Sequence, residues 1–299
     1  MNALRFTVLE GRSVLTVAGP DRRSFLQGLV SNDVERAAPD RAIHAAFLTP
    51  QGRFLHDLFI VELGDTLLLD IEAGRRADLL KRLSMYRLRS KVTLGDGGED
   101  WTVLALFGPG AGHPFGLPEE AGAAVAAAGG VAYVDPRLAA LGLRAVLPRG
   151  EAEKAAQARG FAEAPFADYD RLRLAQGVPD GSRDLPVEKA ILLEAGFDEL
   201  NGVDWQKGCY MGQELTARTK YRGLVRKRLM PVAIEGPVPE PGTPLTFDGK
   251  DAGEMRSGRD GLGLALVRLE AAEAAAAAGR PLEAGPAKLV PHRPDWARF

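Results

Sequence analysis

The pattern of the chain changes near residues 225–229. Before this point, short strand-like runs alternate with runs that have the spacing of amphipathic helices. After it, closely spaced prolines divide the chain into short apolar runs, and Asp248-Gly249 is typical of a two-residue hairpin turn. We therefore expect an α+β region over residues 1–227 and a small β-barrel or sandwich over residues 228–299. The prolines are Pro231, Pro237, Pro239, Pro241 and Pro244.

Two mixed-sheet α+β units are expected within the first region. The runs 5–9 and 13–18 predict a β-hairpin, because a short polar turn containing glycine separates them. Residues 72–86 predict a helix with leucines on one face, and the alanine-rich residues 119–128 predict a second helix. The chain has 299 residues, a length at which a single hydrophobic core becomes hard to enlarge. Two or three domains are therefore expected.

The composition is that of an ordinary globular protein without a strong charge bias. The 38 basic and 40 acidic residues give a net charge of -2, which does not indicate a nucleic-acid or membrane partner. The single cysteine cannot form an internal disulfide, and the four histidines lack the spacing of zinc ligands. Charge interrupts the N-terminal sequence too early for a signal peptide. We expect a cytoplasmic protein with no metal site and no membrane partner.

The segment 205–214, Trp-Gln-Lys-Gly-Cys-Tyr-Met-Gly-Gln-Glu, places two glycines around the only cysteine. A helix is expected to begin near Gly212. Because Lys207 lies two positions before Cys209, the local field is expected to lower the pKa of the thiol and favour the reactive thiolate. The alternative is a cysteine that packs in the core as a small apolar side chain.

A basic segment follows, with six cations in eleven residues and one aromatic side chain among them. Such a cluster suits a polyanion, such as a polyglutamate tail, a phosphate or an RNA backbone. The alternative is a solvated strand edge protected by its charges. The segment contains Arg218, Lys220, Tyr221, Arg222, Arg226, Lys227 and Arg228.

The sequence over residues 207–214, continued by residues 217–219 and 221–223, resembles the signature of the YgfZ-type folate-binding proteins. These proteins are relatives of the aminomethyltransferase (T-protein) of glycine cleavage. The resemblance covers nearly the whole chain. Similar segments lie at residues 25–28, 31–33, 47–53, 177–181 and 261–268.

The resemblance implies both an architecture and a function. The architecture consists of two interleaved α+β subdomains, the second at roughly residues 40–100, and a C-terminal antiparallel β-barrel, around a folate-binding hole. The function implied is that of a tetrahydrofolate-binding accessory protein in iron–sulfur cluster assembly or repair, with an effect on tRNA modification. Its implied partners are iron–sulfur assembly factors or client iron–sulfur proteins. RNA is a weaker expectation, and we expect a monomer.

The resemblance also assigns roles to individual residues. Cys209 is expected to be the key thiol. Glu194 corresponds to a glutamate that accepts hydrogen bonds from the pterin, a task for which a carboxylate is well suited. An Asp-Asp pair of the aminomethyltransferases corresponds to His56-Asp57 in this sequence. A neutral imidazole at His56 lacks the negative charge needed to order the substrate amine and accept its proton. Asp57 keeps aminomethyl transfer open as the alternative activity. The other expected folate-binding residues are Lys207, Tyr210, Arg218 and Arg222.

Overall fold

The computed structural model describes residues 3–223 and 225–299, so that Met1, Asn2 and Leu224, which belong to the predicted 1–227 region, lie outside the described residues. The chain divides into two compact units, each made from three separate stretches. Unit 1 comprises Met1–Leu48, His56–Tyr169 and Asn201–Met211. Unit 2 comprises Thr49–Leu55, Asp170–Leu200 and Gly212–Phe299.

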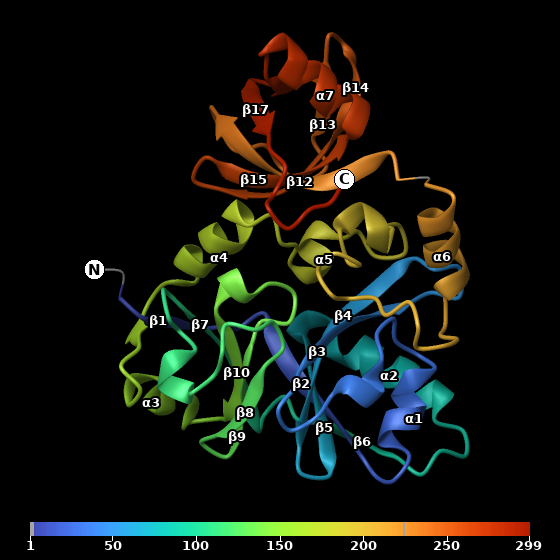
Figure 1. The fold of residues 1–299 in the computed structure, drawn as a ribbon, viewed down its shortest axis with the longest axis vertical. Helices are drawn as coiled ribbons and strands as arrows, with labels where there is room; N and C mark the ends of the chain where they lie inside the picture. The colour runs from blue at the N-terminus through green and yellow to red at the C-terminus, as the bar shows by residue number, and fades with distance from the viewer. Residues whose placement is uncertain (1–2, 224) are drawn as a thin grey trace. The chain divides into compact units, whose positions relative to one another are not determined.

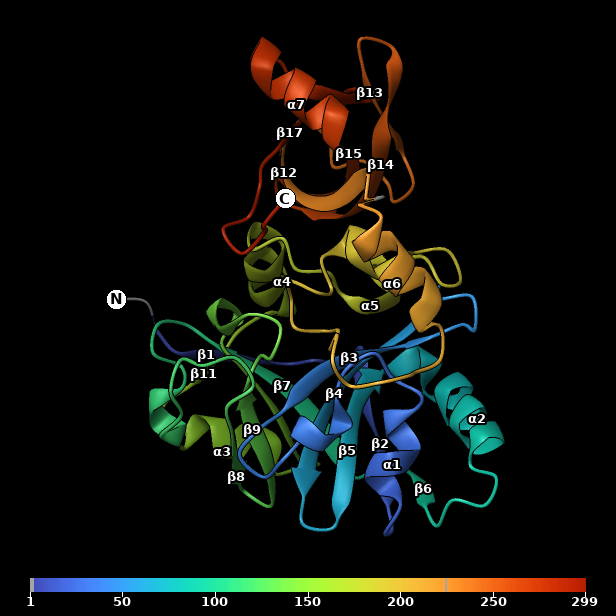
Figure 2. The same ribbon diagram turned by 45° about the vertical axis from the view of Figure 1, so that its right-hand side comes forward.

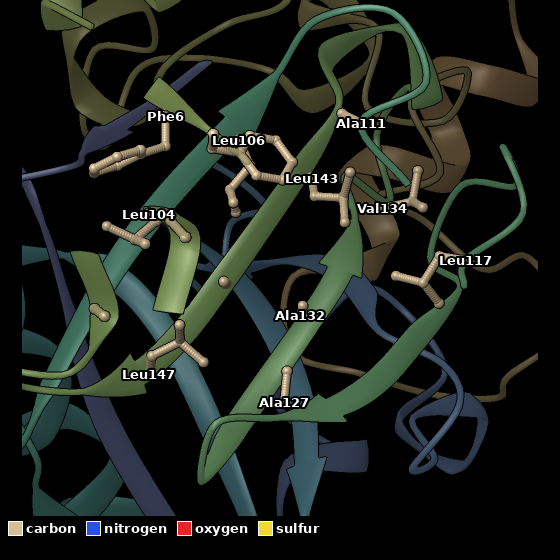
Figure 3. Close-up of a cluster of buried hydrophobic side chains, with 14 of the residues drawn as sticks. Phe6, Leu104, Leu106, Ala111, Leu117, Ala127, Ala132, Val134, Leu143 and Leu147 are labelled. Carbon is tan, nitrogen blue, oxygen red and sulfur yellow. The ribbon is translucent and has the colours of Figure 1, made fainter. Parts of the chain in front are cut away.

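A six-stranded sheet forms one part of unit 1. Its order is β11-β1-β7-β10-β9-β8, and every pairing is antiparallel except that of β1 with β11. Apolar side chains from its strands form a buried core with α3 (Ala152–Gln157), as Figure 3 shows. The strands are β11 (Ala162–Glu163), β1 (Arg5–Val8), β7 (Trp101–Phe107), β10 (Leu143–Pro148), β9 (Gly130–Val134) and β8 (Ala124–Ala127).

The prediction of a helix over residues 119–128 is wrong, because the structure has the strand β8 there. Ala127 pairs with Gly130, so Ala128 and Gly129 form a tight two-residue turn. Both turn residues have positive φ, 47° and 79°, the conformation that two-residue hairpin turns require. Pairing with the buried strand β9 therefore outweighs the helix propensity of the alanines.

A five-stranded sheet, in the order β3-β4-β5-β2-β6, forms the second part of unit 1. The predicted hairpin between residues 5–9 and 13–18 is wrong, because β1 pairs with β7 in the first sheet whereas β2 pairs with β5 in the second. Helix α2 (Arg76–Tyr86) packs on β2 and β6 through the buried Leu79 and Leu83 (Figure 2). The strands are β3 (Ile43–Leu48), β4 (Phe54–Leu63), β5 (Thr66–Glu72), β2 (Arg12–Ala18) and β6 (Thr93–Asp96).

A buried ionic network connects strands of the two sheets. The carboxylate of Asp70 on β5 accepts hydrogen bonds from Arg12 Nε on β2, at 2.7 Å, and from Arg144 Nη2 on β10, at 2.6 Å. The hydroxyl of Tyr133 on β9 donates to the same carboxylate at 3.1 Å. Both guanidinium groups also lie over the ring of Phe59, at 5.2 and 4.1 Å from its centroid. The network therefore satisfies its own buried charges.

We expect Asp70→Asn to destabilise the protein by about 3–5 kcal/mol, since it leaves two buried guanidinium groups without their shared counter-charge. Urea unfolding followed by circular dichroism measures the change. The matched control is Asp65→Asn, because Asp65 is fully exposed and lies 3.7 Å from Arg22. An exposed pair of this kind contributes about 0–1 kcal/mol. Equal stability of the two variants would contradict a structural role for the network.

Unit 2 contains a closed barrel in the order β12-β15-β14-β13-β16-β17 (Figure 1), so the predicted α+β class with a C-terminal antiparallel barrel is confirmed. Asp248 and Gly249, with φ of 49° and 72°, form the predicted turn between β13 and β14. Helix α7 (Leu269–Ala278) buries Ala271 and Ala275 in the barrel core. The strands are β12 (Lys227–Glu235), β15 (Leu262–Arg268), β14 (Lys250–Arg259), β13 (Pro244–Phe247), β16 (Leu282–Ala284) and β17 (Ala287–Pro291).

The remaining helices are short. No helix within residues 3–223 and 225–299 has the length and apolar character needed to cross a membrane. The α-helices are α1 (Arg22–Gln27), α4 (Phe166–Ala175), α5 (Gly181–Asp184) and α6 (Gln213–Tyr221), and the 3-10 helices are η1 (Val34–Arg36), η2 (Ala73–Arg75), η3 (His113–Phe115), η4 (Ala139–Leu141) and η5 (Leu192–Ala195).

Candidate functional site

Unit 2 contains a cavity of about 610 Å³ lined by Glu194. This volume lies within the range of small-molecule sites, which is roughly 300–1,000 Å³. The lining is strongly charged, with more cations than carboxylates. The cations are Arg53, Arg183, Lys189, Lys227 and Arg256, and the carboxylates are Asp184, Glu194 and Glu254.

The position of Glu194 is fixed by the short helix η5. Leu192, Leu193 and Ala195 are buried, which leaves Glu194 as the only polar side chain of the turn. Gly196 ends the helix with a left-handed φ of 70°. A Cβ at this position would lie 2.8 Å from the ring of Trp296, so the close packing requires glycine. The local fold thus places one carboxylate at the cavity wall.

Burial raises the pKa of Glu194 above its ordinary value. The positive charges of Lys227, Arg53 and Arg256 oppose this shift, while the neighbouring Glu254 adds to it. A partly buried carboxylate at a cavity wall is suited to accept N–H groups from a bound molecule. The cations around it are suited to bind the negative groups of the same molecule.

Lys207 and Tyr210, which the sequence analysis assigned to one site, lie together in unit 1. The ammonium of Lys207 lies 5.1 Å from the centre of the Tyr210 ring. It also donates hydrogen bonds of 2.6 Å to the backbone carbonyls of Gln27 and Val30. Burial lowers the pKa of Lys207 to about 8, and the negative charges of two nearby aspartates oppose the shift.

Cys209 is exposed, so the alternative of a core-packing cysteine is wrong. Gly208 precedes it with a left-handed φ of 90°. Helix α6 begins at Gln213, close to the predicted Gly212 and four residues after the thiol. Although Lys207 is close to Cys209 in the sequence, its ammonium donates hydrogen bonds to two backbone carbonyl oxygens of unit 1.

The basic segment does not form one continuous cationic surface. Arg218 pairs with Glu214 one turn earlier in α6, and Arg228 pairs with Glu199 at 2.9 Å. Arg222 is exposed and ends α6. Neither Arg218 nor Arg222 is among the described residues that line the cavity of unit 2, whereas Lys227 from the same segment is. Their assignment to folate binding stays a prediction.

Asp57 lies in the buried network of unit 1. Only 3% of the residue is exposed, and Arg12 Nη1 donates to both of its carboxylate oxygens, at 3.1 and 3.2 Å. Burial alone would raise the pKa of Asp57, but the positive charge of Arg12 and of nearby groups lowers it to about 2. The neighbouring His56 hydrogen-bonds Asp78 at 2.9 Å. Burial and the charge of Arg75 lower the pKa of His56 to about 4.

Several charged residues that line the cavity were not predicted from the sequence to be binding residues. Arg53 lies in the segment 47–53 that supports the family resemblance, but a single arginine after a glycine turn does not by itself indicate a binding role. Glu254 and Arg256 alternate on β14, a pattern that charged residues on one face of any strand can have. Their convergence on Glu194 depends on the folding of distant segments. Within the described part of the chain, no cluster of three or more histidine, cysteine or carboxylate side chains could hold a metal ion.

Comparison with known proteins places the fold in the class of the glycine-cleavage T-proteins. Residues 11–114 match the GCVT N-terminal domain, and residues 226–299 match the CAF17 C-terminal beta-barrel domain. The crystal structure of glycine cleavage system aminomethyltransferase T from Bartonella henselae is similar, with a TM-score of 0.72 and 18% identity. The similarity covers 90% of this chain and 79% of that one.

Three curated relatives are each named as an iron-sulfur cluster assembly factor IBA57, or its homologue, of the mitochondrion. The human protein is 37% identical, with 96% of this chain and 84% of its own length covered. The mouse protein is 36% identical, with coverages of 88% and 77%, and that of Mycosarcoma maydis is 32% identical, with 87% and 72%. The chain therefore belongs to the IBA57 family.

Two predictions are corrected by these matches. The resemblance to YgfZ-type proteins identified a related family, whereas IBA57 is the specific match. The prediction of a cytoplasmic protein is wrong, because these relatives are named as mitochondrial. A single cysteine excludes only an internal disulfide, and this does not distinguish the cytoplasm from other compartments.

The position of Lys207 gives a pH-dependent prediction. We expect acylation of its amine by a mild reagent to show a midpoint near pH 8 in the folded protein, because burial disfavours the charged form. In the chain unfolded by urea, the midpoint of the same residue should move to about 10.4. Mass spectrometry of the labelled peptide at a series of pH values measures both. Coincident midpoints would show that the fold does not perturb this lysine.

Proposed function

We propose that this chain is an iron–sulfur cluster assembly factor that binds tetrahydrofolate, or a one-carbon derivative, in the cavity of unit 2. Membership of the IBA57 family supports the first part, since its relatives are named for that activity. The placement of Glu194 in a charged cavity of suitable volume carries the second part. Proteins of iron–sulfur assembly or client iron–sulfur proteins are the partners this function implies.

The residues of the cavity fit the chemistry of a folate. The pterin presents adjacent N–H groups, which a carboxylate such as Glu194 can accept as two parallel hydrogen bonds. The glutamate moiety carries carboxylates, for which Arg53, Lys189 and Lys227 are matching charges. When bound, the folate supplies a carrier for a one-carbon unit. The protein residues would bind and orient it.

Cys209 is the residue we propose to act in cluster assembly. Its exposure allows contact with a cluster or with a partner protein. One thiolate is too few to hold a cluster, since iron–sulfur clusters generally need several thiolate or comparable ligands. The cluster is therefore a substrate that Cys209 would share with a partner protein.

The alternative functions receive less support from the geometry. Aminomethyl transfer would require a carboxylate that can accept a proton, but the contacts of Asp57 with Arg12 favour its charged form so strongly that it is a poor base. A tRNA-linked role through the basic segment is weakened because Arg218 and Arg228 are already paired with carboxylates. We therefore give priority to folate binding combined with cluster assembly.

We expect Glu194→Gln to weaken tetrahydrofolate binding by about 1.5–3 kcal/mol, the range for hydrogen bonds to a charged group. Isothermal titration calorimetry measures the affinity. The matched control is Glu235→Gln, which makes the same change at an exposed carboxylate of β12 outside the cavity. If both variants bind like the unmodified protein, Glu194 does not bind the pterin.

We expect Cys209→Ser to fail to restore iron–sulfur enzyme activity in cells that lack the protein, while its tetrahydrofolate affinity stays unchanged. The serine retains the size of the side chain but is a poor cluster ligand. Gln206→Ala is the control, because this neighbouring residue is also exposed. Full rescue by the serine variant would remove the thiol from the mechanism.

A further inference from the structure

The end of α2 and the loop after it form a strongly basic part of unit 1. Residues 79–95 contain five cations and no acidic residue, although the whole chain has a net charge of -2. Within the described residues, four of the five form no ion pair. The four are Lys81, Arg87, Arg89 and Lys91.

The same part of the chain exposes large apolar side chains. Residues 84–89 are six consecutive exposed positions, so the chain projects from the surface of the unit at this point. Met85 is 60% exposed and Leu88 is 87% exposed, the highest value among the large hydrophobic side chains that the structure describes. Tyr86 contacts the ring of Phe47 edge-on, which anchors the projection to β3. We refer to residues 81–91 as the basic tip.

The backbone at Leu88 adds a second observation. Its φ is 42°, in the left-handed region, just after the end of α2. Glycine is the usual residue where a helix ends in this way, since a side chain there costs about 1–2 kcal/mol per residue. The chain instead carries a leucine whose side chain gains almost no burial in return. Such a residue is better explained by something that covers it outside the chain.

We propose that the basic tip binds an anionic lipid surface, with Leu88 and Met85 entering the interface. Leu88 is flanked directly by Arg87 and Arg89, an arrangement that places an apolar group in the lipid and cations at the headgroups. Tyr86 is a tyrosine, a residue type that is enriched at membrane interfaces. A convex tip needs no complementary pocket on a lipid surface, whereas a protein partner would have to provide one. The proposal does not depend on the proposed function.

The charge of the whole chain predicts no membrane partner. The basic tip is a local exception to that average, since the acidic residues lie elsewhere in the sequence. Electrostatic attraction of a few cations contributes about 1 kcal/mol for each near an anionic surface, so binding should be reversible and sensitive to salt. Figure 2 shows the loop between α2 and β6 that carries the tip.

Co-sedimentation of the full chain with vesicles tests the proposal. We expect the protein to sediment with vesicles of phosphatidylcholine containing about 30% phosphatidylserine, but not with phosphatidylcholine alone, and to be released as salt is raised. Leu88→Gly should weaken binding at least about tenfold, because it removes the apolar group. This variant also relieves the backbone strain, so it should remain folded.

Two control variants separate the tip from general effects. Val290→Ala removes apolar atoms from another exposed side chain, 55% exposed on β17, and should bind like the unmodified protein. The double variant Arg87→Glu with Arg89→Glu should lose binding, whereas Lys154→Glu with Lys250→Glu, with the same change in charge, should retain most of it. Failure of the unmodified protein to sediment, or equal binding by all variants, would overturn the proposal. Tip-dependent binding to soluble polyglutamate without binding to vesicles would also overturn it, in favour of an acidic protein.

Discussion

The buried charge of Asp70 is the constraint on which the rest of unit 1 depends. Arg12 and Asp70 belong to the five-stranded sheet, whereas Arg144 and Tyr133 belong to the six-stranded sheet. Their hydrogen bonds therefore fix the register of one sheet against the other. Hydrophobic packing alone is tolerant of small shifts, but a carboxylate that accepts four hydrogen bonds from three side chains is satisfied in very few arrangements. The network thus determines where the neighbouring strands present their side chains.

This network also changes what Asp57 can do. Arg12 donates to Asp57 through Nη1 and to Asp70 through Nε, so the two carboxylates share one guanidinium. A carboxylate held in this way stabilises the fold by remaining charged, and it is correspondingly poor at accepting a proton. A protein can therefore keep the fold of an aminomethyltransferase while the aspartate at position 57 stabilises the structure. The same physical interaction supports the architecture and disfavours the transferase chemistry.

The sequence predicted those features that depend on local chemistry. The turn at Asp248-Gly249 and the barrel strands follow from backbone preferences of neighbouring residues, and both are present. The strand at residues 124–127 and the separation of β1 from β2 depend on partners far away in the chain, so local propensity predicted the wrong element or the wrong pairing. Glu194 was assigned through a family resemblance, and its role in folate binding stays a prediction. Glu254 and Arg256, which line the same cavity, were missed, because β14 brings them from a much later part of the chain.

The exposure of Cys209 is a consequence of how its segment is held at both ends. At one end, the hydroxyl of Ser31 donates to the carbonyl of Gly202, and the side chain of Asn32 donates to the carbonyl of Asn201. At the other end, the N–H of Met211 donates to the carbonyl of Gly28. Lys207 adds two further hydrogen bonds to carbonyls of the same part of unit 1. The segment lacks regular secondary structure, yet its backbone is fixed around the thiol. An accessible sulfur on a fixed backbone loses little conformational entropy when a partner binds, which is the property that the proposed role of Cys209 would need.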